Sequence, residues 1–112
     1  MKAGRFFLNN DLLDEAALCF NLYLQLKPLD AQGYLAMGDL SMKQENYENA
    51  LSFFNKALEV NENFFPAKFN RARALQHLKR NMEAVSDLKE IIRNYPDSPQ
   101  AEEAKRILID IQ

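Results

Sequence analysis

The stretch YLAMGDLSMKQENYENALSFFNKA, residues 34–57, decides the fold because its small and aromatic side chains return elsewhere in the chain. A step of 34 residues in either direction meets a similar side chain at three positions. The three columns are Gly4, Gly38 and Ala72; Ala16, Ala50 and Ala84; and Phe20, Phe54 and Leu88. A small residue that recurs at one place on a helix marks a close approach of another helix, so this period predicts stacked structural repeats.

The apolar residues between the turns are spaced by three and four, as on one face of a helix. We expect helices over residues 12–26, 32–43, 47–58, 66–78 and 84–92, one before them and one starting behind Ser98 and Pro99. Asp11 and Asp30 are placed to cap the second and third of these helices, and Pro66 opens the fifth. Strand-like alternation is absent from the sequence. The pattern predicts an all-α fold of short antiparallel helix pairs.

Composition excludes several classes of function. A formal net charge of −2 disfavours nucleic acid or an anionic membrane as the main partner. Cys19 and His77 are the single cysteine and the single histidine, and neither belongs to a ligand cluster, so we expect no metal and no cofactor. The sequence has no glycine-rich phosphate loop and no nucleophile elbow, which predicts that the protein is not an enzyme. It also has no membrane-length apolar run and no signal peptide, which favours a cytoplasmic setting.

One helix carries a run of basic residues that could bind phosphates. The run consists of Lys68, Arg71, Arg73, Lys79 and Arg80. These charges point in several directions around the helix, and Phe69 is the one aromatic residue interleaved with them. We therefore interpret the run as a solvated helix with long side-chain stems and expect no nucleic-acid binding.

The columns and their spacing resemble those of the tetratricopeptide repeat family. The middle unit supplies Tyr34, Met37-Gly38, Ala50, Phe54 and Ala57. Ser41, Glu62, Arg71 and Asn81 depart from the family pattern without breaking a helix. The resemblance implies one domain over residues 1–112, a right-handed superhelical array of antiparallel helix pairs. Its expected parts are a repeat over 1–30 that lacks its opening turn, repeats over 31–64 and 65–98, and a capping helix over 99–112.

The resemblance also implies a non-catalytic protein–protein interaction module that binds a peptide or protein segment in a concave groove. We expect the groove on the side of each first helix that does not carry the packing residues. The predicted groove residues are Arg5, Asn9, Leu35, Asp39, Met42, Lys43, Phe69, Asn70, Arg73 and His77.

The predicted groove is positive on a negative chain. Lys2, Arg5, Lys43 and Arg73 face a single acid, Asp39. Either this surplus has no function, or it attracts an acidic segment or a C-terminal carboxylate, with Arg73 as the central anchor and Leu35, Met42 and Phe69 as apolar pockets. The family's carboxylate clamp for chaperone C-termini is not evident, because Met1, Ala36 and Pro66 occupy its key positions. Asn9 and Asn70 match it in part.

Two other functions compete with this hypothesis. Residues 12–26, 30–31 and 61–66 resemble the three-repeat chaperones of bacterial type III secretion translocators, which hold a hydrophobic client. The alternative is a self-assembling structural unit.

The two ends of the chain predict a homodimer or an upstream segment that covers the first repeat. Phe6, Phe7 and Phe20 lack the family's opening turn. At the other end we expect Ile107 and Ile111 to point away from the packing face of the closing helix and to be exposed. The predicted self-association residues are therefore Phe6, Phe7, Ile107 and Ile111.

Overall fold

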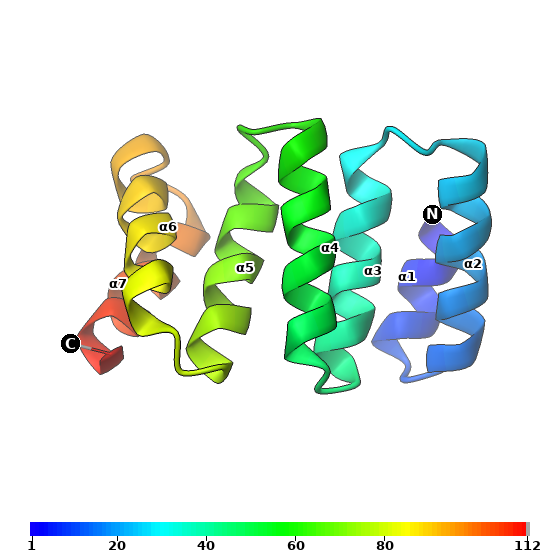
Figure 1. Cartoon of the computed structure of the whole chain (residues 1–112), viewed down its shortest axis with the longest axis horizontal. Coiled ribbons are helices and arrows are strands. Elements are labelled where there is room, and N and C mark those ends of the chain that lie inside the picture. Colours follow the sequence, from blue (N-terminus) through cyan, green and yellow to red (C-terminus); the bar gives the residue numbers. More distant parts are fainter. Residues whose placement is uncertain (112) are drawn as a thin grey trace.

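The computed structural model describes residues 1–111 and contains seven helices within them, with no strand in this part of the chain (Figure 1). The helices are α1 (Lys2–Asn9), α2 (Leu13–Leu26), α3 (Ala31–Lys43), α4 (Tyr47–Val60), α5 (Phe65–His77), α6 (Asn81–Asn94) and α7 (Pro99–Ile111). The all-α prediction is confirmed. Gln112, the last residue of the predicted capping helix, lies outside the described residues.

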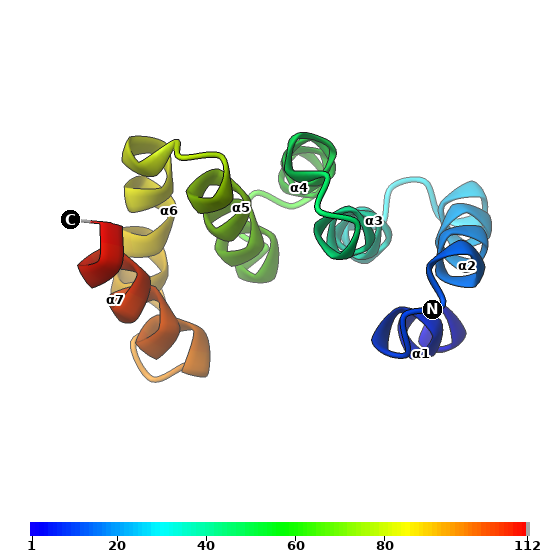
Figure 2. The same ribbon diagram turned by 90° about the horizontal axis from the view of Figure 1, so that it is seen from below.

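Successive helices pack side by side in an arch. Each helix contacts the next one along the chain, and α3 also contacts α5. Seen from below, α1, α3, α5 and α7 lie on the inner side of the arch, whereas α2, α4 and α6 lie on its outer side (Figure 2). None of these helices, within residues 1–111, is long and apolar enough to cross a membrane.

Glycine in the 34-residue columns makes room for a phenylalanine ring. A Cβ atom added at Gly38 would overlap the ring of Phe54, and one added at Gly4 would overlap the ring of Phe20. Both rings are fully buried. The third repeat has Ala72 and Leu88 at the same positions, a larger residue facing a smaller one. The recurring small residues are therefore packing positions, as the period predicts.

The turns inside the three helix pairs also repeat. Asp11, Glu45 and Lys79, spaced 34 residues apart, have backbone φ angles of 60°, 59° and 63°. Asp11 occupies this left-handed turn, so it does not cap α2, which begins without a side-chain hydrogen bond. That capping prediction was wrong. Asp30 does cap α3, since its carboxylate accepts a hydrogen bond from the backbone N–H of Gln32 at 2.9 Å.

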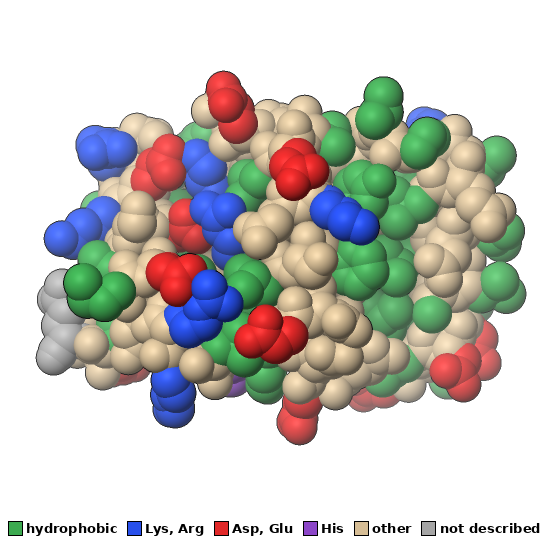
Figure 3. Space-filling view, viewed as in Figure 1, with side chains coloured by type: hydrophobic (Ala, Val, Ile, Leu, Met, Phe, Trp, Pro, Cys, Tyr) green, Lys and Arg blue, Asp and Glu red, His purple; other side chains and the backbone are tan. Residues whose placement is uncertain are grey.

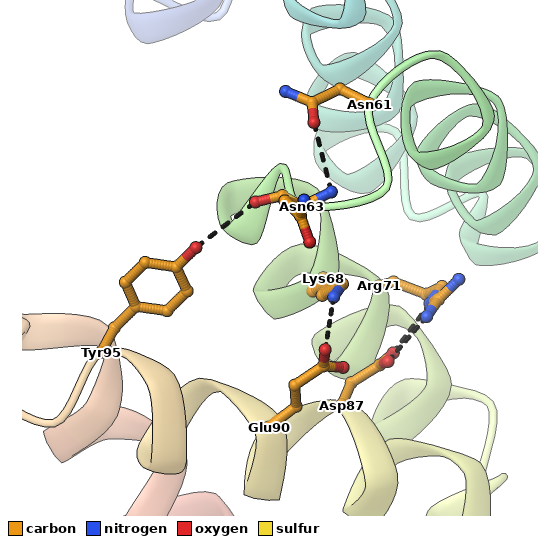
Figure 4. A network of polar contacts seen from close by, with 7 residues as sticks. All are labelled: Asn61, Asn63, Lys68, Arg71, Asp87, Glu90 and Tyr95. Carbon is orange, nitrogen blue, oxygen red and sulfur yellow. Dashed lines mark hydrogen bonds and ion pairs between the residues drawn. The ribbon is translucent and has the colours of Figure 1, made fainter.

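Ion pairs fasten α5 to α6 (Figure 4). The guanidinium of Arg71 donates two hydrogen bonds to the buried carboxylate of Asp87, at 2.7 and 2.6 Å. Lys68 pairs with Glu90 at 2.7 Å, and Arg80 pairs with an acid in the first turn of α6 at 2.8 Å. Three of the five residues of the basic run are thus neutralised by α6 and do not form a phosphate-binding face.

The closing helix packs differently from the prediction. Ile107 is 6% exposed and belongs to the core cluster with Leu88, and Ile111 packs against that cluster. Because α7 begins at Pro99, the stripe that includes Ala104 and Ile107 faces the third repeat, and Ile109, 76% exposed, faces solvent. The expectation that Ile107 and Ile111 point outward was wrong.

The first repeat is also better covered than expected. Phe20 is fully buried and Phe7 packs against the core, whereas Phe6 is 61% exposed. Among the four predicted self-association residues, Phe6 alone belongs to the exposed large hydrophobic side chains.

Candidate functional site

A hollow of about 380 Å³ lies among the inner helices α1, α3 and α5 and the first residue of α4. The lining residues are Arg5, Leu8, Asn9, Asp39, Met42, Lys43, Tyr47, Asn70, Arg73 and His77. Most of them fall in two columns of the 34-residue repeat, one of Arg5, Asp39 and Arg73 and the other of Asn9, Lys43 and His77. The repeat therefore builds the hollow by placing equivalent side chains of three helices side by side. We call this set of ten residues the inner groove.

Asp39 is the centre of the inner groove. Its carboxylate accepts a hydrogen bond from the guanidinium of Arg5 at 2.5 Å and another from the side-chain amide of Asn70 at 2.8 Å. These contacts join α1, α3 and α5 through one side chain, which is 20% exposed. Asp39 thus fixes the relative position of the three helices that form the groove.

Burial raises the pKa of Asp39 above its ordinary value of 3.8. The hydrogen bond and the charge of Arg5, the amide of Asn70 and the charge of Arg73 oppose this shift without cancelling it. The carboxylate is therefore held in its charged form by neighbouring cations against a desolvation cost.

This shift predicts how the stability of an Asp39→Asn variant depends on pH. Folded Asp39 takes up a proton at a higher pH than unfolded Asp39, so its contribution to the free energy of unfolding is fullest below pH 3.8 and declines as the pH rises through the raised pKa. We expect the variant to gain stability relative to the wild type as the pH rises through this window, in urea titrations from about pH 3 to pH 7. A relative loss of stability with rising pH would mean that the Arg5 pair outweighs desolvation.

The three cations of the inner groove differ in how far they are neutralised. Arg5 is paired with Asp39, and Lys43 makes a long, exposed contact of 3.4 Å with Asp11. Arg73 is exposed, and no carboxylate of residues 1–111 lies within ion-pair distance of it. The positive charge available to a ligand is therefore centred on Arg73, which narrows the broad positive surface expected from the sequence.

An aromatic pair forms one wall of the groove. The rings of Tyr47 and His77 are parallel, with centroids 4.3 Å apart. The sequence pattern assigned Tyr47 to the packing stripe of its helix, so this groove residue was missed. The signal available was its place as the first residue of α4, directly after the turn that faces the groove.

Eight of the ten predicted groove residues line the hollow, and two do not. Leu35 and Phe69 are 6% and 9% exposed and pack in the hydrophobic core. They face the second helices of their pairs, since each lies three residues before a small column residue that packs on the same side. The predicted apolar pockets at Leu35 and Phe69 are therefore wrong, and Met42 and the Tyr47–His77 pair provide the apolar surface.

A larger hollow of about 590 Å³ lies at the edge formed by the α2–α3 and α4–α5 loops. Its charged side chains are already engaged. The hydroxyl of Tyr23 donates a hydrogen bond to Asp30 at 2.5 Å, which is the main cause of the lowered pKa of Asp30, and the ammonium of Lys27 lies over the Tyr23 ring. The inner groove, with an exposed arginine beside an aromatic wall, is the better candidate site. No group of three His, Cys, Asp or Glu residues within 1–111 is arranged to hold a metal ion.

The model of the tetratricopeptide repeat matches residues 31–64 and 67–98, which together make up more than half of the chain. The chain belongs to the tetratricopeptide repeat family.

Relatives and solved structures agree with this assignment. The chain is 33% identical over 75 residues to human protein O-mannosyl-transferase TMTC3, a match that covers 67% of the chain and 8% of that protein. It is 27% identical over 111 residues to rat sperm-associated antigen 1, covering 99% of the chain and 12% of that protein. The chain thus spans about a tenth of the length of these relatives.

Among solved structures, the first TPR of Spaghetti (RPAP3) bound to the HSP90 peptide SRMEEVD superposes with a TM-score of 0.91 at 21% identity, covering 98% of this chain and 87% of that one. At this level of identity the likeness establishes the fold.

Proposed function

We propose that this chain is a peptide-binding module whose inner groove takes an acidic segment of another protein. The observation that carries the proposal is Arg73, an exposed guanidinium without an ion partner in residues 1–111, placed between Asp39 and the Tyr47–His77 pair. Charged side chains that remain unpaired in a concave surface attract ligands of opposite sign. Arg73 supplies a planar donor that can bind a carboxylate with two hydrogen bonds.

The rest of the inner groove suits an extended peptide. Lys43, on the neighbouring helix α3, can meet a second acidic side chain, because its contact with Asp11 is long and exposed on both sides. Met42 and the stacked rings offer apolar surface beside the two cations. Asn9 and Asn70 add amide groups that can bind the peptide backbone. Charge would set the sign of the ligand, and these neighbours would set its position.

The solved neighbour supports an acidic ligand but not the same mode of recognition. The Spaghetti TPR is bound to SRMEEVD, a peptide with three acidic side chains. In the present chain Met1, Ala36 and Pro66 stand where the clamp for a C-terminal carboxylate has its key residues. We therefore assign the charge recognition to acidic side chains, which can lie inside a longer segment and need no free C-terminus.

Fluorescence anisotropy with three labelled probes tests the proposal. The probes are SRMEEVD, the same peptide with an amidated C-terminus, and the neutral analogue SRMQQVN. We expect the two acidic probes to bind alike and the neutral one at least about 10-fold more weakly, because two or three charge contacts are lost. Affinity for the acidic probes should fall as salt shortens the screening length to a few ångströms. Equal binding of SRMEEVD and SRMQQVN would refute the proposal, and loss of binding on amidation would assign recognition to the terminal carboxylate.

The two competing functions gain no support from the comparisons. A secretion chaperone for a hydrophobic client would need an extended apolar groove, and the inner groove is mostly polar in its lining. A purely structural unit would leave Arg73 without a role. The cytoplasmic setting stays a prediction.

A further inference from the structure

The exposed apolar surface of the described residues is concentrated in the first helix pair. Nine large hydrophobic side chains are exposed, and six of them lie within the first 30 residues. These six are Phe6, Leu12, Leu18, Leu22, Leu26 and Leu29. The remaining three, Val60, Met82 and Ile109, are scattered over three different helices. A gathered apolar surface indicates a contact, whereas single exposed residues do not.

The centre of this surface is a row of leucines on the solvent side of α2. Leu18, Leu22 and Leu26 follow one another at intervals of four residues and are 61%, 50% and 83% exposed. We call these three residues the leucine row. On an α-helix this spacing places them along one ridge about 12 Å long.

The repeat architecture does not require the leucine row. The equivalent positions of the second repeat are Ser52, Lys56 and Val60, and those of the third are Ser86, Glu90 and Asn94. Figure 3 shows the same contrast on the outer face, where hydrophobic side chains gather over α2 and towards α4 and charged side chains cover α5 and α6. Because α4 and α6 stack without such a row, its role lies in a contact outside the repeat array.

We propose that the leucine row docks on the leucine row of a second copy of this chain, with the two α2 helices antiparallel about a two-fold axis near Leu22. The charges at the two ends of the row select this occupant. Asp14 stands four residues before Leu18 on the same ridge, and Lys27 directly follows Leu26. In an antiparallel pair, Asp14 of one copy comes within about one helical turn of Lys27 of the other, and the two-fold axis repeats the contact.

Neither end of the row is satisfied within the described chain. Asp14 and Lys27 are exposed and take part in no ion pair of residues 1–111. A parallel arrangement would place Asp14 beside Asp14 and Lys27 beside Lys27, which is repulsive at both ends. The row is thus complementary to itself in one orientation.

Such a dimer leaves both inner grooves open, because α2 lies on the outer side of the arch and the groove is lined by α1, α3, α4 and α5 (Figure 2). Two grooves in one particle would bind a ligand with two acidic segments more tightly than a single groove does. The dimer itself does not depend on the ligand assigned to the groove. It replaces the predicted contact through Ile107 and Ile111, which the fold buries.

Sedimentation equilibrium of the 112-residue chain tests the dimer, from about 1 μM to about 1 mM. We expect a monomer–dimer equilibrium in which Leu22→Glu raises the dissociation constant at least about 100-fold, since each substitution occurs twice in a two-fold interface. Met82→Glu on α6 is the matched control, an exposed apolar residue outside the row, and should change nothing. Far-UV circular dichroism verifies that both variants stay folded.

Charge exchange adds a test that does not depend on apolar surface. Asp14→Lys and Lys27→Glu should each weaken the dimer about 10-fold or more, because each variant brings like charges together. An equimolar mixture of the two variants should recover the wild-type dissociation constant. In the mixed dimer the lysine introduced in one copy faces the glutamate introduced in the other, and the second contact is the original pair of Asp14 and Lys27.

Three results would overturn the proposal. One is a monomer at every concentration, which is also the result expected if the row holds a helix of a different protein or an upstream segment. Another is a dimer that resists Leu22→Glu but is lost in Ile109→Glu. The third is a mixture of the charge variants that stays as weak as either variant alone.

Discussion

Gly38→Val is expected to lower the free energy of unfolding by about 3 kcal/mol, because the new side chain has to enter space held by a buried phenylalanine ring. A Cβ atom at position 38 already overlaps Phe54, whose side chain is fully buried and cannot move outward. Valine adds two methyl groups to that overlap. Urea denaturation at neutral pH measures the loss, and Ala3→Val on the exposed side of α1 is the control with little expected effect.

The chain contains its own rescue for this position. The third repeat combines Ala72 with Leu88 where the second combines Gly38 with Phe54. Gly38→Ala and Phe54→Leu should each destabilise the fold, and the double variant should be more stable than the sum predicts by about 1 kcal/mol or more. Strict additivity would show that the two columns are not coupled in the way the packing indicates.

Arg73→Glu is expected to weaken binding of the acidic SRMEEVD probe about 100-fold, since one substitution removes an attraction and adds a repulsion, each worth about 10-fold. The free energy of unfolding should change little, because Arg73 is exposed and holds no ion pair within residues 1–111. Adding Lys43→Glu should weaken binding further.

Lys56→Glu is the control for charge alone. Lys56 is exposed on α4, lies over the ring of Phe53 and is not among the residues of the inner groove. Both variants change the net charge of the chain equally. If Lys56→Glu reduces affinity as much as Arg73→Glu does, the binding follows total charge and the groove has no special role.

The 34-residue period was enough to predict the fold, because it records packing directly. Gly38 and Phe54 are the small and large partners in one contact, so their spacing in the sequence reflects a distance between helices. The helix ends followed from local signals such as the Asp30 cap. Asp11 misled because a carboxylate near a helix start favours a cap, whereas the repeat uses this residue in a left-handed turn.

The groove was predicted less completely, for reasons of geometry. The sequence shows which face of a helix is free of packing residues, but Leu35 and Phe69 border that face and turn into the core. It also does not show which charges neutralise each other. Asp39 and Arg5 belong to different helices, and their contact depends on how closely the repeats stack. The pairing that leaves Arg73 unneutralised therefore emerged from the structure.

A titration of the ¹⁵N-labelled chain with SRMEEVD, followed by amide chemical shifts, tests the central claim most directly. Acidic binding in the inner groove predicts that the largest shift changes fall on α3 and α5, around Asp39, Arg73 and His77, and that the outer faces of α2, α4 and α6 stay unchanged. The same titration with Arg73→Glu should show little change at equal peptide concentration. Shift changes centred on the outer helices, or unaltered in Arg73→Glu, would contradict the assignment of the inner groove as the binding site.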